Sequence, residues 1–116
     1  MYRINVLPLV SADFTINFLV ENTRVKIRFM WDTLIEYWVV NEYLEPDTGK
    51  RFTGVKVIPQ YPITENVPTT LQGALMVGKT NNNMGTYINY DDFGNGWDLF
   101  YLSPTEYAEW KVLSGL

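Results

Sequence analysis

One segment of the chain matches the phosphate-binding loop in its letters. Gly73 to Thr80 reads GALMVGKT, which fits the pattern G-x-x-x-x-G-K-[ST]. A working phosphate loop needs a strand before its first glycine, backbone N–H groups that face the phosphate, and a helix that begins at the lysine. Here the residues between the two glycines are all apolar, and the polar run Asn81 to Gly85 follows where the helix should begin. We therefore predict a strand that runs into a loop, and no nucleotide site.

Carboxylates could support two further kinds of chemistry. Pairs such as Glu36/Glu42 could serve glycoside hydrolysis, which needs two carboxylates at a set separation. With 13 acidic residues in 116, however, such pairs arise by chance. A hard cation could find oxygen ligands in one late segment, at Asp91, Asp92, Asn95 and Asp98. Their spacing departs from that of a calcium-binding EF-hand loop, so we interpret the segment as a turn and expect no metal, no cofactor and no catalytic residues.

The composition excludes several function classes at once. The chain has no His and no Cys, which removes Ser-His and Cys-His nucleophile pairs, thiolate metal sites and disulfides. Its net charge is −4, and its only basic cluster is the alternating set Arg24, Lys26 and Arg28, so we expect no nucleic-acid partner. No apolar run reaches membrane-spanning length and the N-terminus lacks signal-peptide features, which predicts a soluble protein with no membrane insertion.

The strands that would position these side chains are organised around residues 24–49. In the run RVKIRFMW (24–31), apolar residues alternate with Arg24, Lys26 and Arg28, which predicts a half-buried strand. The run 34–44 is apolar on both parities, so we expect it to lie between two layers, or between the core and a partner. The sequence Asp47-Thr48-Gly49 then predicts a turn.

The rest of the chain predicts further short strands and one helix. Ser103, Pro104 and Glu106 supply the N-cap, the proline of the first turn and the acidic residue of a helix start. That helix should present Tyr107, Trp110, Val112 and Leu113 on an apolar side and end at Gly115. The other expected elements are an edge strand or arm (2–10), a strand paired in a hairpin with 24–31 (13–20), a strand broken at Gly54 (51–58), a proline-rich loop (59–70), strands at 71–77, 87–90 and 97–102, and a turn at 91–96.

These elements predict one all-β domain over residues 1–116. We expect a small antiparallel barrel or sandwich of six to seven strands with one short C-terminal helix. Aromatic residues make up 16% of the chain, more than a small core hides, which indicates that some lie at an interface. The candidate interface residues are Tyr2, Ile4, Val6, Arg24, Lys26, Arg28, Trp38, Tyr87 and Tyr90. The basic face 24/26/28 is either a solvated strand face or a docking surface for an acidic partner.

Several pieces follow one another along the chain in a characteristic order: Leu7-Pro8-Leu9, Phe14 to Val20, Val25 to Trp31, Trp38, Asp47-Thr48-Gly49, Asp91-Asp92-Phe93-Gly94, Leu99 to Leu102, Pro104 and Glu106. This order, more than any single piece, resembles the baseplate plug proteins of contractile-tailed bacteriophages, a family first described in a cyanophage baseplate. The resemblance covers nearly the whole chain. The segment Asn81 to Gly85 and the step Asn95-Gly96 depart from the family pattern.

The resemblance implies a structural virion protein at the centre of the tail baseplate, where hub, tail tube and spike meet. It implies synthesis in the host cytoplasm, several copies around the tail axis and no catalytic residues. Two other function classes stay open from the residues alone. One is a carbohydrate-binding module with Trp or Tyr as a stacking platform, and the other is a small cell-wall glycosidase.

Overall fold

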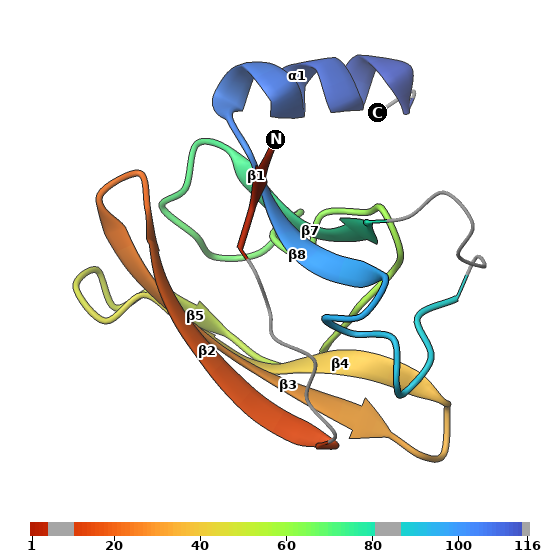
Figure 1. Cartoon of the computed structure of the whole chain (residues 1–116). Coiled ribbons are helices and arrows are strands. Elements are labelled where there is room, and N and C mark those ends of the chain that lie inside the picture. Colours follow the sequence, from red (N-terminus) through yellow and green to blue (C-terminus); the bar gives the residue numbers. More distant parts are fainter. Residues whose placement is uncertain (5–10, 81–86, 115–116) are drawn as a thin grey trace.

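Two antiparallel sheets and one helix form three layers (Figure 1). This arrangement comes from a computed structural model that describes residues 1–4, 11–80 and 87–114. The larger sheet has the order β2 (Asp13–Val20), β3 (Thr23–Asp32), β4 (Tyr37–Leu44) and β5 (Arg51–Phe52), and β6 (Val55–Lys56) also pairs with β4. The smaller sheet has the order β1 (Tyr2–Arg3), β8 (Trp97–Leu102) and β7 (Ala74–Lys79), and α1 (Pro104–Leu113) follows β8.

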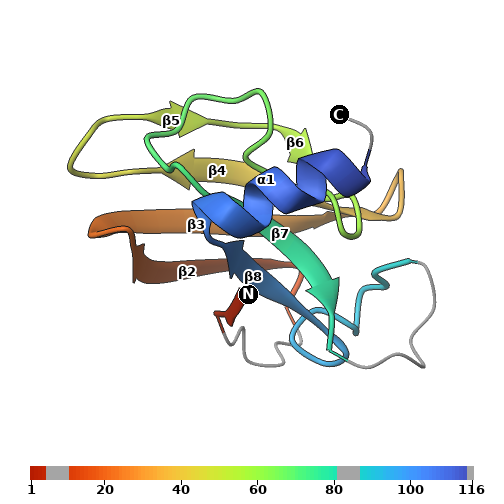
Figure 2. The same ribbon diagram turned by 90° about the horizontal axis from the view of Figure 1, so that it is seen from above.

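The predicted fold class is confirmed, in its sandwich form. The described strands do not close into a barrel. The smaller sheet lies between the larger sheet and α1, and its strands cross those of the larger sheet when viewed from above (Figure 2). The predicted strand 51–58 is present as β5 and β6, and the break falls at Gly54, whose φ of 73° suits glycine.

The hairpin of β2 and β3 forms as predicted, with a two-residue turn. Glu21 and Asn22 have φ of 51° and 56°, and Val20 pairs with Thr23. Two residues at positive φ give a turn whose twist matches that of the paired strands. The strict alternation of β3 then buries Val25, Ile27 and Phe29, and leaves the basic residues on the outer face.

Three strand predictions are wrong. In the run 34–44 the strand begins only at Tyr37, because Leu34 and Ile35 lie in a turn and are 93% and 49% exposed. Its two faces also differ: one is buried in the core, while the other is only partly covered. The strand expected at 71–77 runs instead from Ala74 to Lys79. Residues 87–90 form no strand, and the part of the arm at 5–10 lies outside the described residues.

The apolar run of β7 is explained by the layers on both of its sides. Leu75 and Val77 pack in the core against the larger sheet, whereas Ala74 and Met76 pack with Tyr107 and other residues of the helix side. Every residue of β7 has a partner in β8. The segment that resembles a phosphate loop is therefore a paired strand, as predicted.

The helix begins at the predicted residue, but the prediction of its apolar side is wrong. The Ser103 hydroxyl oxygen accepts a hydrogen bond from the Glu106 N–H at 3.2 Å, and the Glu106 carboxylate accepts one from the Ser103 N–H at 3.0 Å. Trp110 packs toward the smaller sheet, while Val112 and Leu113 are 80% and 88% exposed. Gly115, the predicted stop, lies outside the described residues.

A fully buried carboxylate ties the end of β4 to the segment that leads into β7. Glu45 is 0% exposed and accepts hydrogen bonds from the hydroxyls of Tyr43 and Thr48, both at 2.7 Å. It also accepts one from the Thr69 hydroxyl at 2.8 Å, and others from the hydroxyl and N–H of Thr70. Burial raises the pKa of Glu45, but these donors outweigh it and lower the pKa to about 2.

A second carboxylate joins the tip of the β2–β3 hairpin to the smaller sheet. The Glu21 oxygens accept hydrogen bonds from the N–H groups of Gln72 and Gly73, both at 2.8 Å, and from the Tyr101 hydroxyl. Burial raises the pKa of Glu21, and the three donors more than offset this, so that the pKa lies below its usual value. Gly73 is required here because a Cβ would lie 2.1 Å from the Leu102 carbonyl oxygen.

The Glu45 cluster predicts a specific loss of stability in acid. A pKa of about 2 in the folded protein, against 4.5 in the unfolded chain, corresponds to about 3 kcal/mol of stability. Because the folded pKa is depressed, this contribution is complete above pH 4.5 and is lost as the pH falls toward 2. In urea unfolding, Glu45→Gln should lose about 2–4 kcal/mol of the free energy of unfolding at pH 7. The free energy of unfolding of this variant should also fall less steeply below pH 4.5 (the acid limb of its pH dependence) than that of the wild type.

The matched control is Glu42→Gln, on the outer face of the same strand, where Arg51 lies 3.4 Å from the carboxylate. This variant should keep the wild-type acid limb. Equal acid limbs for the wild type and Glu45→Gln would contradict the assignment of a charged, hydrogen-bonded Glu45.

Candidate functional site

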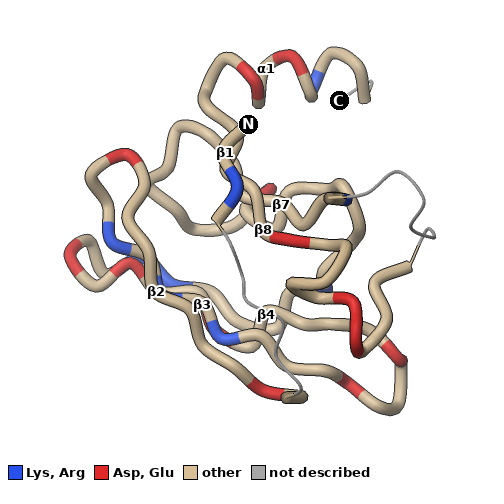
Figure 3. Tube along the Cα trace, viewed as in Figure 1, with Lys and Arg blue, Asp and Glu red and all other residues tan. Residues whose placement is uncertain are grey.

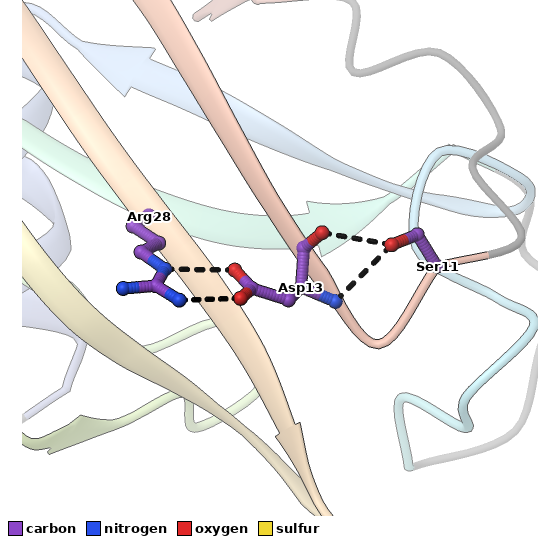
Figure 4. Close-up of polar contacts among 3 residues, drawn as sticks. All are labelled: Ser11, Asp13 and Arg28. Atoms are coloured by element: carbon purple, nitrogen blue, oxygen red, sulfur yellow. Dashed lines mark hydrogen bonds and ion pairs between the residues drawn. The ribbon is translucent and has the colours of Figure 1, made fainter.

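The basic outer face of β3 is internally neutralised at two of its three residues. Arg24 donates two hydrogen bonds to Asp47, at 2.9 and 2.7 Å. Arg28 does the same with Asp13, whose backbone is held by Ser11 (Figure 4). Hydrogen bonds from these arginines lower the pKa of both carboxyl groups. Lys26, between them, makes no ion pair with any residue in the described ranges, so it is the unneutralised charge of the predicted face. Figure 3 shows basic and acidic positions near one another along the larger sheet.

Two sheet edges lie beside each other and flank a groove. β1 is the edge of the smaller sheet and β2 that of the larger one, and a groove of about 490 Å³ is lined from both. Two predicted interface residues lie here: Tyr2 is 64% exposed, and the Ile4 N–H donates to the Leu99 carbonyl at 2.8 Å. Val6, a third, lies outside the described residues.

Trp38 lies in the core, which corrects its place among the surface candidates. It is 1% exposed, and its indole N–H donates to the Asn89 carbonyl at 3.2 Å. Its ring makes edge contacts with Phe14 and Phe93 and stacks on Tyr90 at 6.1 Å between centroids. Because the ring is covered, Trp38 is neither a contact residue of this surface nor a stacking platform for sugars, and its role is to support Tyr90.

The predicted residues Tyr87 and Tyr90 lie together at an aromatic hollow of about 550 Å³. Tyr87 is 65% exposed, and the Tyr90 ring meets Trp31 edge-on at 5.8 Å. We define the aromatic hollow by all of its lining residues, which are Trp31, Ile35, Glu36, Tyr37, Tyr87, Asn89, Tyr90 and Asp91.

The turn between β3 and β4 forms one wall of the aromatic hollow and is held by its first residue. The Asp32 carboxylate accepts hydrogen bonds from the N–H groups of Leu34 and Ile35 at 2.9 and 3.3 Å, and its carbonyl accepts one from Glu36 at 2.8 Å. Glu36 has a φ of 56°, which an L residue adopts only where its surroundings impose it.

The sequence did not predict that the β3–β4 turn lies beside Tyr87. Trp31, Glu36 and Tyr37 are some fifty residues away along the chain, and local patterns carry no information on such contacts. The available signal was a pair of aromatics, Trp31 and Tyr37, on either side of a turn.

The acidic groups considered for metal binding or hydrolysis do not converge. Asp98 is 0% exposed and accepts a hydrogen bond from Arg3 at 2.6 Å, while Asp92 accepts one from the Asn89 N–H at 3.1 Å. Glu36 lies at the aromatic hollow, whereas Glu42 lies beside Arg51. No set of three potential ligands lies close enough to hold a metal ion within the parts of the chain that the structure describes.

The geometry defines a class of protein first. This is a helix-covered antiparallel β sandwich. Its surface offers strand edges that pair with no other described strand, ion-paired charges and an aromatic hollow, all features of a module that packs against other molecules. The family model described as cyanophage baseplate Pam3 plug gp18 matches residues 1–105, and the chain therefore belongs to this baseplate plug family. The family implies a structural role in the phage tail baseplate. Most of α1 lies beyond the matched residues.

A search of curated proteins found no match. Among the described helices, none has the length and apolarity needed to cross a membrane.

Two tryptophan substitutions test the supporting role of Trp38. Trp38→Phe removes ring volume and the hydrogen bond to Asn89, whereas Trp97→Phe removes volume from an equally buried ring whose N–H has no partner among the described residues. Trp38→Phe should therefore cost about 1 kcal/mol more in urea unfolding. It should also shift the NMR signals of Tyr90, which Trp97→Phe should leave in place. Equal losses of unfolding free energy in the two variants, together with unchanged NMR signals of Tyr90 in Trp38→Phe, would contradict this assignment.

Proposed function

We propose that this protein joins the hub, tail tube and spike at the centre of a phage baseplate through β-rich packing interfaces. The observation that carries this proposal is the match of the plug family over residues 1–105. We further propose synthesis in the host cytoplasm, assembly in several copies around the tail axis, and no catalytic activity.

The surface supports a role in assembly. β2 is the edge strand of the larger sheet. Its residues Thr15, Asn17 and Leu19 alternate with Ile16 and Phe18, and they direct their backbone N–H and C=O groups away from β3. Edge strands usually carry charge or proline that prevents pairing with another chain, and these three residues carry neither. Leu19 is also 61% exposed, so the edge offers both hydrogen bonds and apolar contact to a neighbour.

A carbohydrate-binding module is the second candidate, and one observation favours it. The aromatic hollow presents four aromatic residues to solvent, Trp31, Tyr37, Tyr87 and Tyr90. Aromatic faces stack on sugar rings. A glycan array with the wild type and Tyr87→Ala separates the two functions, because only a sugar-binding module loses a defined glycan signal.

Co-assembly tests the proposed function directly. The purified chain, mixed with the hub protein of its own phage, should leave a size-exclusion column in a complex larger than either partner. A chain that stays a monomer with hub, tube and spike proteins, and is absent from purified tails, would contradict the proposal.

The basic face has a separate test. Because Arg24 and Arg28 are already ion-paired, Lys26→Glu should be the single change that most weakens docking on an acidic surface. Its melting temperature should stay close to the wild-type value, since Lys26 makes no ion pair with any of the described residues. Lys50→Glu, in the turn after β4, is the control and should assemble normally. Intact assembly of Lys26→Glu would exclude this face as an interface.

A further inference from the structure

The rim of the aromatic hollow carries two carboxylates without cationic partners. Glu36 and Asp91 line the hollow, and neither makes an ion pair with a residue of the described ranges. The lining contains no Lys or Arg. Three other acidic residues of the larger sheet and its turns, Asp13, Asp47 and Glu42, by contrast each lie against an arginine.

The aromatic walls add to the attraction for a positive charge. The face of an aromatic ring is electron-rich, and a cation within about 6 Å of its centroid is stabilised. Tyr37 already shows this property, since the Lys56 ammonium nitrogen lies 3.5 Å from the centre of its ring. Trp31, Tyr87 and Tyr90 line the same space as the two unpaired carboxylates. Aromatic faces beside uncompensated negative charges select a cationic side chain.

Resting on the proposed function, we propose that the aromatic hollow receives an arginine side chain from a neighbouring baseplate protein. Arginine fits better than lysine because its planar guanidinium stacks on aromatic rings while it donates to carboxylates. A volume of about 550 Å³ also admits the residues that flank the arginine in a peptide segment. The hydroxyls of a neutral sugar could donate to these carboxylates but would leave both negative charges unbalanced, which favours the cation. Sugar binding is an outcome of the test.

The test uses a small probe on the whole chain. Nα-acetyl-arginine N-methylamide is titrated into the labelled protein and followed by NMR, with the citrulline analogue as a neutral probe of the same shape. The arginine probe should shift the Trp31 indole and the Tyr87 amide, and should bind at least about tenfold more tightly than the citrulline probe. Higher salt should weaken its binding.

Matched variants assign the binding to the aromatic hollow. The double variant Glu36→Gln, Asp91→Asn should weaken binding of the arginine probe about tenfold or more, and leave the citrulline probe unchanged. Glu109→Gln, on the exposed side of α1, should behave as the wild type. Equal binding of the two probes, shifts outside the hollow, shifts with N-acetylglucosamine alone, or no shift up to about 0.1 M probe would overturn the proposal.

The same double variant separates this inference from the proposed function. In the size-exclusion assay with the hub, tube and spike proteins it should lose or weaken association relative to Glu109→Gln. If the double variant assembles as the wild type does, the arginine site is overturned while the baseplate role stands. If the wild type itself fails to assemble and is absent from tails, the baseplate role is overturned.

Discussion

The structure depends on two carboxylates that are held by neutral donors and not by cations. Each accepts several hydrogen bonds from hydroxyl and backbone N–H groups, Glu45 at the end of β4 and Glu21 in the β2–β3 turn. Glu45 is fully buried, and without such donors its carboxyl group would be protonated, because burial alone favours the neutral form. Both clusters join the larger sheet to the segment that leads into β7, so they fix how the two layers of the sandwich meet.

The β2–β3 turn lies at one end of the larger sheet and the β3–β4 turn at the other (Figure 1). Glu21 belongs to the first of these turns, and residues of the second line the aromatic hollow. β3 connects them, since Glu21 lies in the turn that precedes it and the turn that begins at Asp32 follows it. Trp38 supports the hollow from inside through Tyr90, and the core therefore continues into the wall of the surface site. One end of the sandwich is thus fastened by polar contacts, while the other offers aromatic faces and unpaired charge to a partner.

Elements with local signals could be predicted from the sequence. β2 and β8 have the predicted bounds, and the helix begins after Ser103. These predictions succeed because alternation and helix capping depend only on residues close together in the sequence. Contacts across the chain could not be predicted. Glu45 bonds to Thr70, 25 residues away, and Glu21 bonds to Gly73, 52 residues away. Nothing near either glutamate in the sequence indicates these partners.

The candidate site follows the same division. Tyr87 and Tyr90 could be predicted as surface aromatics, but the turn that completes the hollow came from tertiary structure. Trp38 was misplaced because β4 is apolar on both parities, and periodicity alone does not show which parity faces the core. Val112 and Leu113 were misplaced for a related reason, since the helix packs through Tyr107 and Trp110 and leaves its last turn uncovered.

The central claim is that this plug-family chain acts by fitting between other proteins of the baseplate. The most direct measurement is a cryo-EM map of the intact tail of its phage, resolved well enough to trace side chains. The account predicts density for this sandwich on the tail axis, with neighbouring chains against its free edges and its aromatic hollow. A complete baseplate map without this chain, or with those surfaces bare, would contradict it.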